Sequence, residues 1–131
     1  KMIYKKKKLN KKASIVFTVS IGGTSAFVTD SALYGSSKAA LNSFTKFCAV
    51  EFSSRQIRCN SVCPGMINTP MTRPGDYVTE EDYKKDVKNY LVGRYGEPEE
   101  IARTISFLLS DASSFITGTS IIADGGSSIP H

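Results

Sequence analysis

The chain has 131 residues, with 17 lysines and arginines against 12 aspartates and glutamates and a formal charge of +5. Seven of the lysines lie in the first twelve residues, so residues 13–131 hold ten basic and twelve acidic groups, a net charge of −2. With 40% hydrophobic and 22% charged residues, the composition is that of a folded chain and excludes disordered, collagen-like and disulfide-scaffold classes. The length allows one buried core.

The lysine-rich start, KMIYKKKKLNKK, has two interpretations. Clustered lysines bind nucleic-acid phosphates through counterion release, but here Tyr4 is the one aromatic residue among them and the rest of the chain is slightly acidic. A solvated helix face is therefore favoured, and we expect no nucleic-acid partner. The segment has no secretory cleavage pattern, and no run approaches the roughly 18 apolar residues of a membrane span. We expect a cytoplasmic protein without membrane contact.

The three cysteines are Cys48, Cys59 and Cys63, an odd and sparse set among apolar residues. This pattern is typical of reduced thiols in a cytoplasmic protein. The one histidine is the last residue, and a convincing fourth ligand is missing, so we expect no metal site.

The first half of the chain predicts two strands and a helix between them. Residues 14–19, SIVFTV, form an apolar, β-branched run that is typical of a strand buried on both faces of a parallel sheet. Residues 31–53 have apolar positions close to helical spacing and contain no proline, which predicts one long helix. Residues 57–63, IRCNSVC, predict a second strand that ends at Pro64-Gly65.

The second half predicts two helices and a last strand. Thr79, followed by three acidic residues, predicts the N-cap of a polar helix that ends near Leu91. Pro98 marks another helix start, and four apolar residues on one stripe should pack on a sheet: Ile101, Ile105, Leu108 and Leu109. The run TSIIAD predicts a strand that ends at Gly125-Gly126. This order of elements indicates a layered α/β domain.

Tyr34 and Lys38 stand four residues apart on the predicted long helix, so their side chains share one face. An ammonium about 4 Å from a phenol stabilises the phenolate by about 4 kcal/mol at an effective dielectric near 20, which suits the pair to acid-base chemistry. Ser20, after the first strand, would place a hydroxyl beside them. Tyr-x-x-x-Lys also occurs by chance as a solvated lysine beside a packed ring, so the ordered set of surrounding motifs carries the functional interpretation.

These motifs resemble the C-terminal half of the short-chain dehydrogenase/reductase family, over nearly everything from Ala13 to Gly126. The segments that carry the resemblance are SIVFTVSIGG, YGSSKAAL, IRCNSVCPGMINTPM, GRYGEPEEIARTISFLLSD and ITGTSIIADGG. The resemblance implies an α/β fold, the C-terminal half of a Rossmann-like doubly wound parallel sheet with about three strands, the N-terminal half being absent. It implies an NAD- or NADP-dependent oxidoreductase that transfers hydride between nicotinamide and a carbonyl or alcohol. The alternative is a non-catalytic remnant with an oligomeric or structural role.

The resemblance also implies roles for individual residues. Tyr34 is the general acid or base, Lys38 binds the nicotinamide ribose and assists Tyr34, and Ser20 binds the substrate oxygen. Besides Tyr34 and Lys38, the implied cofactor contacts are Pro64, Gly65, Ile67 and Thr69. The implied substrate contacts are Gly22, Met66 and Met71.

Several features depart from the family pattern. The glycine-rich TGxxxGxG turn, the NNAG strand and the fourth catalytic residue, an asparagine, are missing, and Asn10, Asn42 and Asn60 are in the wrong places to replace it. The spacing from Ser20 to Tyr34 is one residue longer than in many members, which leaves Ser25 and Ser31 as alternatives.

We therefore expect a single partial domain over residues 1–131, a piece of a longer protein. Residues 1–12 would be the tail of a preceding helix, and residues 70–95 a mobile substrate lid with a partly apolar surface from Tyr77, Val78 and Tyr83. A homodimer or homotetramer is expected by resemblance. Phe44, Phe47 and Phe52 would then lie either in a helix-pair interface or in the core.

Overall fold

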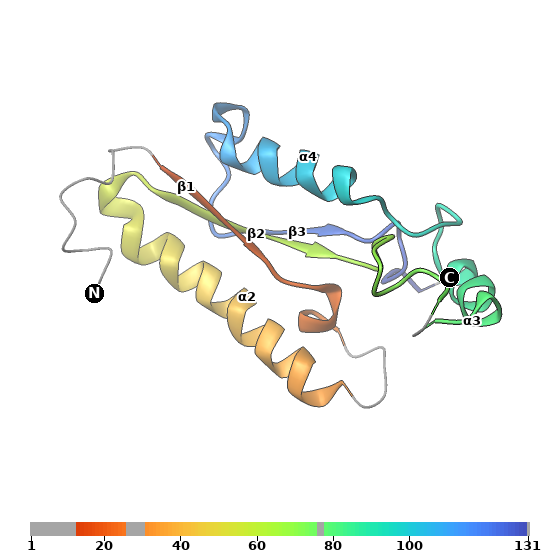
Figure 1. Cartoon of the computed structure of the whole chain (residues 1–131). Coiled ribbons are helices and arrows are strands. Elements are labelled where there is room, and N and C mark those ends of the chain that lie inside the picture. Colours follow the sequence, from red (N-terminus) through yellow and green to blue (C-terminus); the bar gives the residue numbers. More distant parts are fainter. Residues whose placement is uncertain (1–12, 26–30, 76–77, 131) are drawn as a thin grey trace.

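The computed structural model describes residues 13–25, 31–75 and 78–130. Three parallel strands form one sheet in the order β1-β2-β3, with β1 at Ser14–Thr18, β2 at Arg58–Pro64 and β3 at Ser120–Ala123. Helix α2 (Ala32–Phe52) covers one face of the sheet and helix α4 (Pro98–Leu109) covers the other (Figure 1). This is the predicted α/β arrangement of three strands and their helices.

The centre of the sheet is β2, in which residues 59–63 are buried without interruption. Its polar members are paired: the Asn60 amide group donates to the carbonyl of Ile116 at 2.9 Å, and Ser61 Oγ donates to Ser120 Oγ at 2.8 Å. These bonds offset the cost of burying polar groups. Strand β1 was predicted to be buried on both faces but is only half-buried, because it is the outer strand of the described sheet and β2 pairs with one of its edges.

The core between α2 and the sheet consists of Cys48, Ala49, Phe52, Ile57 and Cys59. Two further phenylalanines of α2 lie outside it: the side chains of Phe44 and Phe47 are 54% and 64% exposed. Phe52 therefore belongs to the core, whereas Phe44 covers the edge of the Phe17 ring with 5.7 Å between centroids. All three cysteines are free, and burial raises the pKa of each thiol, that of Cys59 to about 11.

Two helix starts lie where their capping residues predicted them. Helix α4 begins at Pro98, with a capping box between Glu97 and Glu100. Helix α3 (Glu80–Asp86) is capped by Thr79, whose hydroxyl accepts a hydrogen bond from the Asp82 amide at 3.1 Å. The predicted end near Leu91 is wrong: α3 ends at Asp86, and the 3-10 helix η3 (Val87–Asn89) follows. The helical segment stops there because Tyr90, the residue after η3, has an extended backbone and a buried side chain.

The prediction that four apolar residues of α4 pack on the sheet is only partly correct. Leu108 is fully buried and Ile101 and Ile105 are half-buried, but 48% of Leu109 is exposed. Successive helical residues point about 100° apart, so with Leu108 directed at the sheet Leu109 turns toward solvent. The carbonyl of Leu108 in turn accepts hydrogen bonds from Ser14 Oγ at 2.8 Å and Arg58 Nη1 at 2.9 Å, which tie the end of α4 to the sheet.

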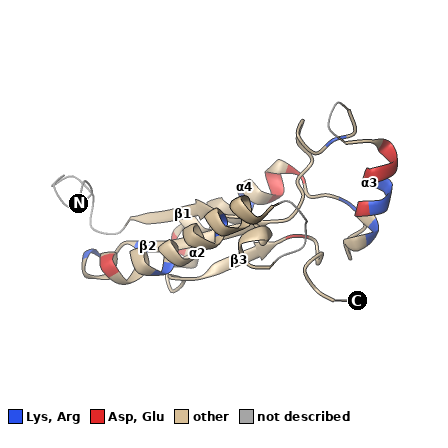
Figure 2. Ribbon diagram, turned by 90° about the horizontal axis from the view of Figure 1, so that it is seen from below, with Lys and Arg blue, Asp and Glu red and all other residues tan. Residues whose placement is uncertain are grey.

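Charged side chains gather on α3, while the sheet carries few (Figure 2). The lysine-rich residues 1–12 lie outside the described residues, and with them Asn10 and the predicted helix tail. Within residues 13–25, 31–75 and 78–130, no helix has the length and apolar character that crossing a membrane requires. The same ranges hold no cluster of three or more His, Cys, Asp or Glu side chains suited to a metal ion.

Candidate active site

The carboxyl ends of the three strands meet at one end of the molecule, together with α3 (Figure 1). There β1 leads into the 3-10 helix η1 (Ile21–Gly23), β2 leads into Gly65 and β3 leads into Asp124. In open parallel sheets this end is where ligands bind. The predicted site residues therefore lie where a ligand site of such a sheet is expected.

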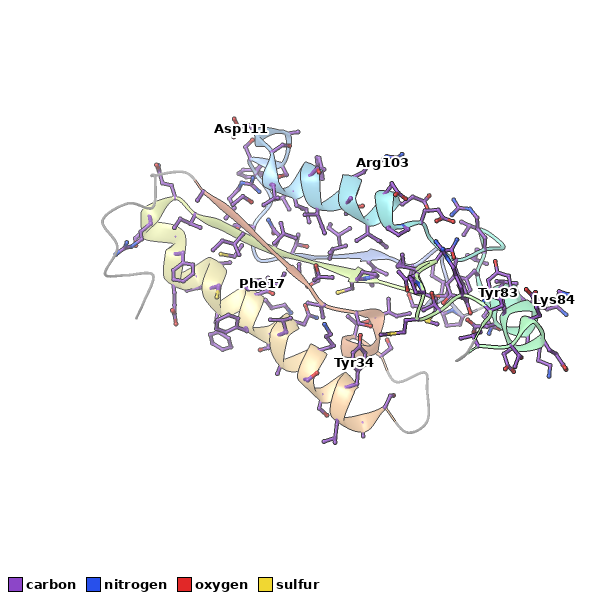
Figure 3. All side chains as sticks on the ribbon, in the orientation of Figure 1. Phe17, Tyr34, Tyr83, Lys84, Arg103 and Asp111 are labelled. Carbon is purple, nitrogen blue, oxygen red and sulfur yellow. The ribbon has the colours of Figure 1, made fainter. Side chains whose placement is uncertain are left out.

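Ser20 and Tyr34 border the same small space above Gly22. The Ser20 hydroxyl accepts a hydrogen bond from the Gly22 amide at 3.1 Å, which fixes its position at the start of η1. A methyl group added at Gly22 would lie 3.5 Å from both Ser20 Oγ and Tyr34 Cε1. Figure 3 shows the Tyr34 side chain between α2 and the turn that follows β1.

Glycines allow this meeting, because they let η1 and α2 approach until their backbones are almost in contact. A Cβ atom at Gly23 would lie 2.6 Å from the carbonyl carbon of Lys38, and one at Gly35 would lie 3.0 Å from the Gly22 carbonyl oxygen. The glycine pair after β1 and the Tyr-Gly pair in α2 are thus the two sides of one contact.

Lys38 lies beside Tyr34 and is held from the sheet. Its ammonium group is 5.7 Å from the centroid of the Tyr34 ring and donates a hydrogen bond to the Thr18 carbonyl at 3.3 Å. The ring itself is 53% exposed, so one side of it is open to a ligand. At this distance the ammonium group is in range of a cation–π contact with the ring.

The two alternative serines lie elsewhere. Ser25 is exposed beyond η1, and its amide donates to the Ile21 carbonyl at 3.0 Å. Ser31 precedes the first turn of α2, where its carbonyl accepts a hydrogen bond from the Gly35 amide at 2.7 Å. Ser20, in contrast, lies beside Tyr34 at Gly22, so the longer spacing in the sequence does not keep Ser20 and Tyr34 apart.

The loop after β2 is built from close backbone contacts. A Cβ atom at Gly65 would lie 2.9 Å from the Cα of Asp124, so no other residue fits there without a shift. Beyond it, the Gly96 amide donates to the Met66 carbonyl at 3.0 Å and the Asn68 amide donates to the Gly96 carbonyl at 2.7 Å. Ile67 and Gly96 form a parallel bridge in which Gly96 bonds to the two neighbours of Ile67, Met66 and Asn68. The amide and carbonyl of Ile67 therefore point to the opposite side.

The three predicted substrate contacts differ in how close they lie to Tyr34. Gly22 lies beside Ser20 and Tyr34, as described above. Met66 is 37% exposed, and its amide donates to the Tyr90 hydroxyl at 3.3 Å. Met71 lies at the surface with 78% of its area exposed, and no described contact brings it to Tyr34.

The predicted lid, residues 70–95, has two parts. Residues 76–77, and so Tyr77, lie outside the described residues, and most of α3 is exposed. Tyr90 and Tyr95, by contrast, are buried, and the Tyr95 hydroxyl donates to Asp86 Oδ2 at 2.8 Å. Burial raises the pKa of both phenols. Tyr90 and Tyr95 are therefore packed into the body, whereas residues 91–94 between them are exposed.

Asp124 is a residue of this region that the sequence did not single out. Its carboxylate is 9% exposed and accepts hydrogen bonds from the amides of Gly126 at 3.0 Å and Ser128 at 2.9 Å. Burial works to raise the pKa of Asp124, but these bonds and those from the Ser128 and Ser127 hydroxyls outweigh it and hold the pKa below its ordinary value. The carboxylate thus fixes the turn that packs on Gly65.

Replacing Asp124 with asparagine is expected to destabilise the protein by roughly 1–3 kcal/mol at neutral pH, because the amide group offers fewer acceptor sites to the donors around it. A carboxyl group whose pKa is lowered by folding stabilises the fold above its unfolded pKa and loses that effect as the pH falls. The difference in melting temperature between Asp124→Asn and the unmodified protein should therefore shrink below about pH 4. The exposed Asp111→Asn is the control, and a difference independent of pH would contradict this role.

Sequence and structure comparisons place this arrangement among known proteins. A protein-family model described as enoyl-(acyl carrier protein) reductase matches residues 2–128. A tropinone reductase homolog of Arabidopsis thaliana is 40% identical over 117 residues, which are 88% of this chain and 42% of the relative. Cyclohexanol dehydrogenase of an Acinetobacter strain is 39% identical over 112 residues, which are 86% of this chain and 42% of that relative. The chain therefore spans about two fifths of these curated relatives.

Solved structures agree with the fold. A short-chain dehydrogenase family protein of Francisella tularensis superposes with a TM-score of 0.83 at 34% identity, over 92% of this chain and 53% of the other. A 4-hydroxyisoleucine dehydrogenase, solved in complex with NADH, gives a TM-score of 0.83 at 34% identity, over 92% of this chain and 49% of the other. The predicted partial Rossmann-like fold is confirmed. The chain belongs to the short-chain dehydrogenase/reductase family, which uses NAD or NADP.

Proposed function

We propose that the protein containing this chain is an NAD- or NADP-dependent oxidoreductase that transfers hydride between nicotinamide and a carbonyl or alcohol substrate. The observation that carries the proposal is the convergence of Ser20 and Tyr34 on the space above Gly22, with Lys38 beside the Tyr34 ring. A non-catalytic remnant would not need these three side chains in one place, so the catalytic function is favoured over the structural alternative.

The contacts of the three side chains support a role for each of them. Ser20 Oγ accepts a hydrogen bond from Gly22, which leaves its own proton free to donate to a substrate oxygen. Tyr34 gives its phenol proton to that oxygen during reduction and removes the alcohol proton during oxidation. Lys38, held by the Thr18 carbonyl, stabilises the phenolate that each cycle produces.

The loop after β2 offers groups that fit a nicotinamide. A carboxamide carries one acceptor and one donor group, and Ile67 and Thr69 supply an amide, a carbonyl and a hydroxyl on neighbouring positions. The dinucleotide, when bound, supplies or accepts the hydride. Tyr34 and Lys38 would hold its ribose, while Pro64 and Gly65 form the turn that lets the ring approach bare backbone.

The remaining assignments follow from the same proposal. A small carbonyl or alcohol compound would lie between Tyr34 and the loop after β2, with Gly22, Met66 and Met71 along its path and residues 70–95 as the lid. The exposed Phe44 and Phe47 of α2 would bury their rings in a homodimer or homotetramer. We place the protein in the cytoplasm.

The test is an assay of the complete protein with both dinucleotides. NADH and NADPH are offered with ketones, steroid ketones, keto sugars and β-ketoacyl thioesters, and NAD+ and NADP+ with the matching alcohols. We expect oxidation or reduction of one dinucleotide that depends on one of these classes. Protein that binds neither dinucleotide and turns over none of the substrates would instead support the structural role.

A further inference from the structure

One hydroxyl group connects the loop residues that follow β2. Thr72 Oγ1 donates a hydrogen bond to the Ile67 carbonyl, accepts one from the Thr69 amide at 3.0 Å, and lies 3.2 Å from Thr69 Oγ1. The sequence analysis did not single out Thr72. Its contacts are with the two residues that the proposed function assigns to the nicotinamide carboxamide.

Counting protons gives the direction of the hydrogen bond between the two threonines. A hydroxyl has one proton to donate. Two carbonyls lie within reach of Thr72 Oγ1, and because that of Ile67 is closer than that of Thr69, at 3.2 Å, the Thr72 proton goes to Ile67. Thr72 Oγ1 can then only accept from Thr69, so Thr69 turns its proton toward Thr72. The lone pairs of Thr69 Oγ1 remain on the other side, where the group acts as an acceptor.

The adjoining amide of Ile67 supplies the matching donor. Ile67 N–H points away from Gly96, and within the described part of the chain it has no hydrogen-bond partner. The loop therefore presents a donor at Ile67 and an acceptor at Thr69. A primary carboxamide presents the complement, an oxygen for the first and an NH2 group for the second.

We propose that Thr72 is a positioning residue that makes Thr69 an acceptor for the carboxamide NH2 group of the nicotinamide cofactor. This inference rests on the proposed function and adds a residue and a direction of hydrogen bonding to it. Thr72 acts through Thr69, and the cofactor contact itself belongs to Ile67 and Thr69.

The loop after β2 has further ties besides the Thr72 hydroxyl. The amides of Thr72 and Arg73 both donate to the Thr69 carbonyl, at 3.0 and 2.9 Å. Arg73 Nε donates to Asn68 Oδ1 at 2.7 Å, and Asn68 Nδ2 donates to Glu97 Oε1 at 2.9 Å. Thr72→Val keeps the shape of the side chain and all of these bonds while it removes the hydroxyl.

The experiment measures the Kd of the complete protein by calorimetry, and its KM, for its preferred dinucleotide and for the 3-acetylpyridine analogue, which carries a methyl group in place of the carboxamide NH2. We expect the Kd to change as the KM does in each variant. Thr72→Val should raise the KM for the natural dinucleotide about three- to tenfold, the effect of one hydrogen bond, and change kcat less than twofold. With the analogue, Thr72→Val and the unmodified protein should have the same KM. Thr72→Ser, which restores the hydroxyl, should restore the natural KM.

Each other result has a distinct meaning. An equal rise in KM for the natural dinucleotide and the analogue would overturn the inference, because it would indicate a general disturbance of the loop. An unchanged KM in Thr72→Val, with normal turnover by the unmodified protein, would overturn the inference and leave the proposed function standing. Unmodified protein that neither binds nor turns over any dinucleotide would overturn both.

Discussion

Replacing Tyr34 with phenylalanine is expected to lower kcat of the complete protein by about 10²- to 10⁴-fold, the usual contribution of a positioned acid-base group. The substitution removes only the phenol oxygen. The ring keeps its contact with the space above Gly22, and the Lys38 ammonium keeps its bond to the Thr18 carbonyl. Because Tyr34 is 53% exposed, the loss of the hydroxyl leaves no buried polar group unpaired, and the melting temperature should stay unchanged.

The matched control is Ser37→Ala, which removes a hydroxyl from the same turn of α2. Ser37 Oγ donates to the Tyr34 carbonyl at 2.7 Å, so this variant alters the backbone environment of Tyr34 but not its phenol group. Initial rates in both reaction directions, together with dinucleotide binding, separate the loss of the phenol group from a change in the geometry of α2. Full turnover by Tyr34→Phe would remove Tyr34 from the catalytic role, and an equal loss in Ser37→Ala would assign the effect to helix geometry.

Local sequence signals predicted the main elements well. The starts of α3 and α4 lie where Thr79, Pro98 and the acidic first turns indicated them, because capping bonds form between residues close in the sequence. Helix α2 lies within the range that its apolar spacing predicted. The β-branched run after Ala13 forms β1, because β-branched side chains favour the extended strand. The spacing of Tyr34 and Lys38 on one helix face suggested an acid-base pair, and the resemblance carried by the surrounding motifs gave the proposed roles of Tyr34, Lys38 and Ser20.

Features that depend on contacts between distant segments were missed. The end of α3 is set by the burial of Tyr90 and Tyr95, and the exposure of Leu109 by the rotation of α4 over the sheet. Asp124 and Thr72 look like ordinary loop residues until the turn beyond β3 and the loop after β2 are folded. Their hydrogen bonds link them to backbone groups within five residues, but their place in the site comes from the meeting of β2 and β3.

Gly23 is where the fold and the proposed chemistry depend on the same contact, and Gly23→Ala is the second variant with a large expected effect. The added methyl would lie 2.6 Å from the Lys38 carbonyl carbon and 2.9 Å from the Ala39 amide nitrogen, which are backbone atoms of α2 and cannot turn aside. Either η1 or α2 must move, at a cost of roughly 1–3 kcal/mol. Gly23 does not have a positive φ, so the cost comes from packing rather than backbone strain.

The same displacement would separate Ser20 from Tyr34, because Ser20 starts η1 and Tyr34 lies one turn before Lys38 in α2. A shift near 1 Å is enough to lower kcat about 100-fold. We therefore expect Gly23→Ala to lose both melting temperature and turnover, whereas Tyr34→Phe loses turnover alone. Gly75→Ala adds the same methyl where the nearest atom is 3.9 Å away and should keep its melting temperature. A stable, fully active Gly23→Ala protein would show that the close approach of η1 to α2 does not position the site.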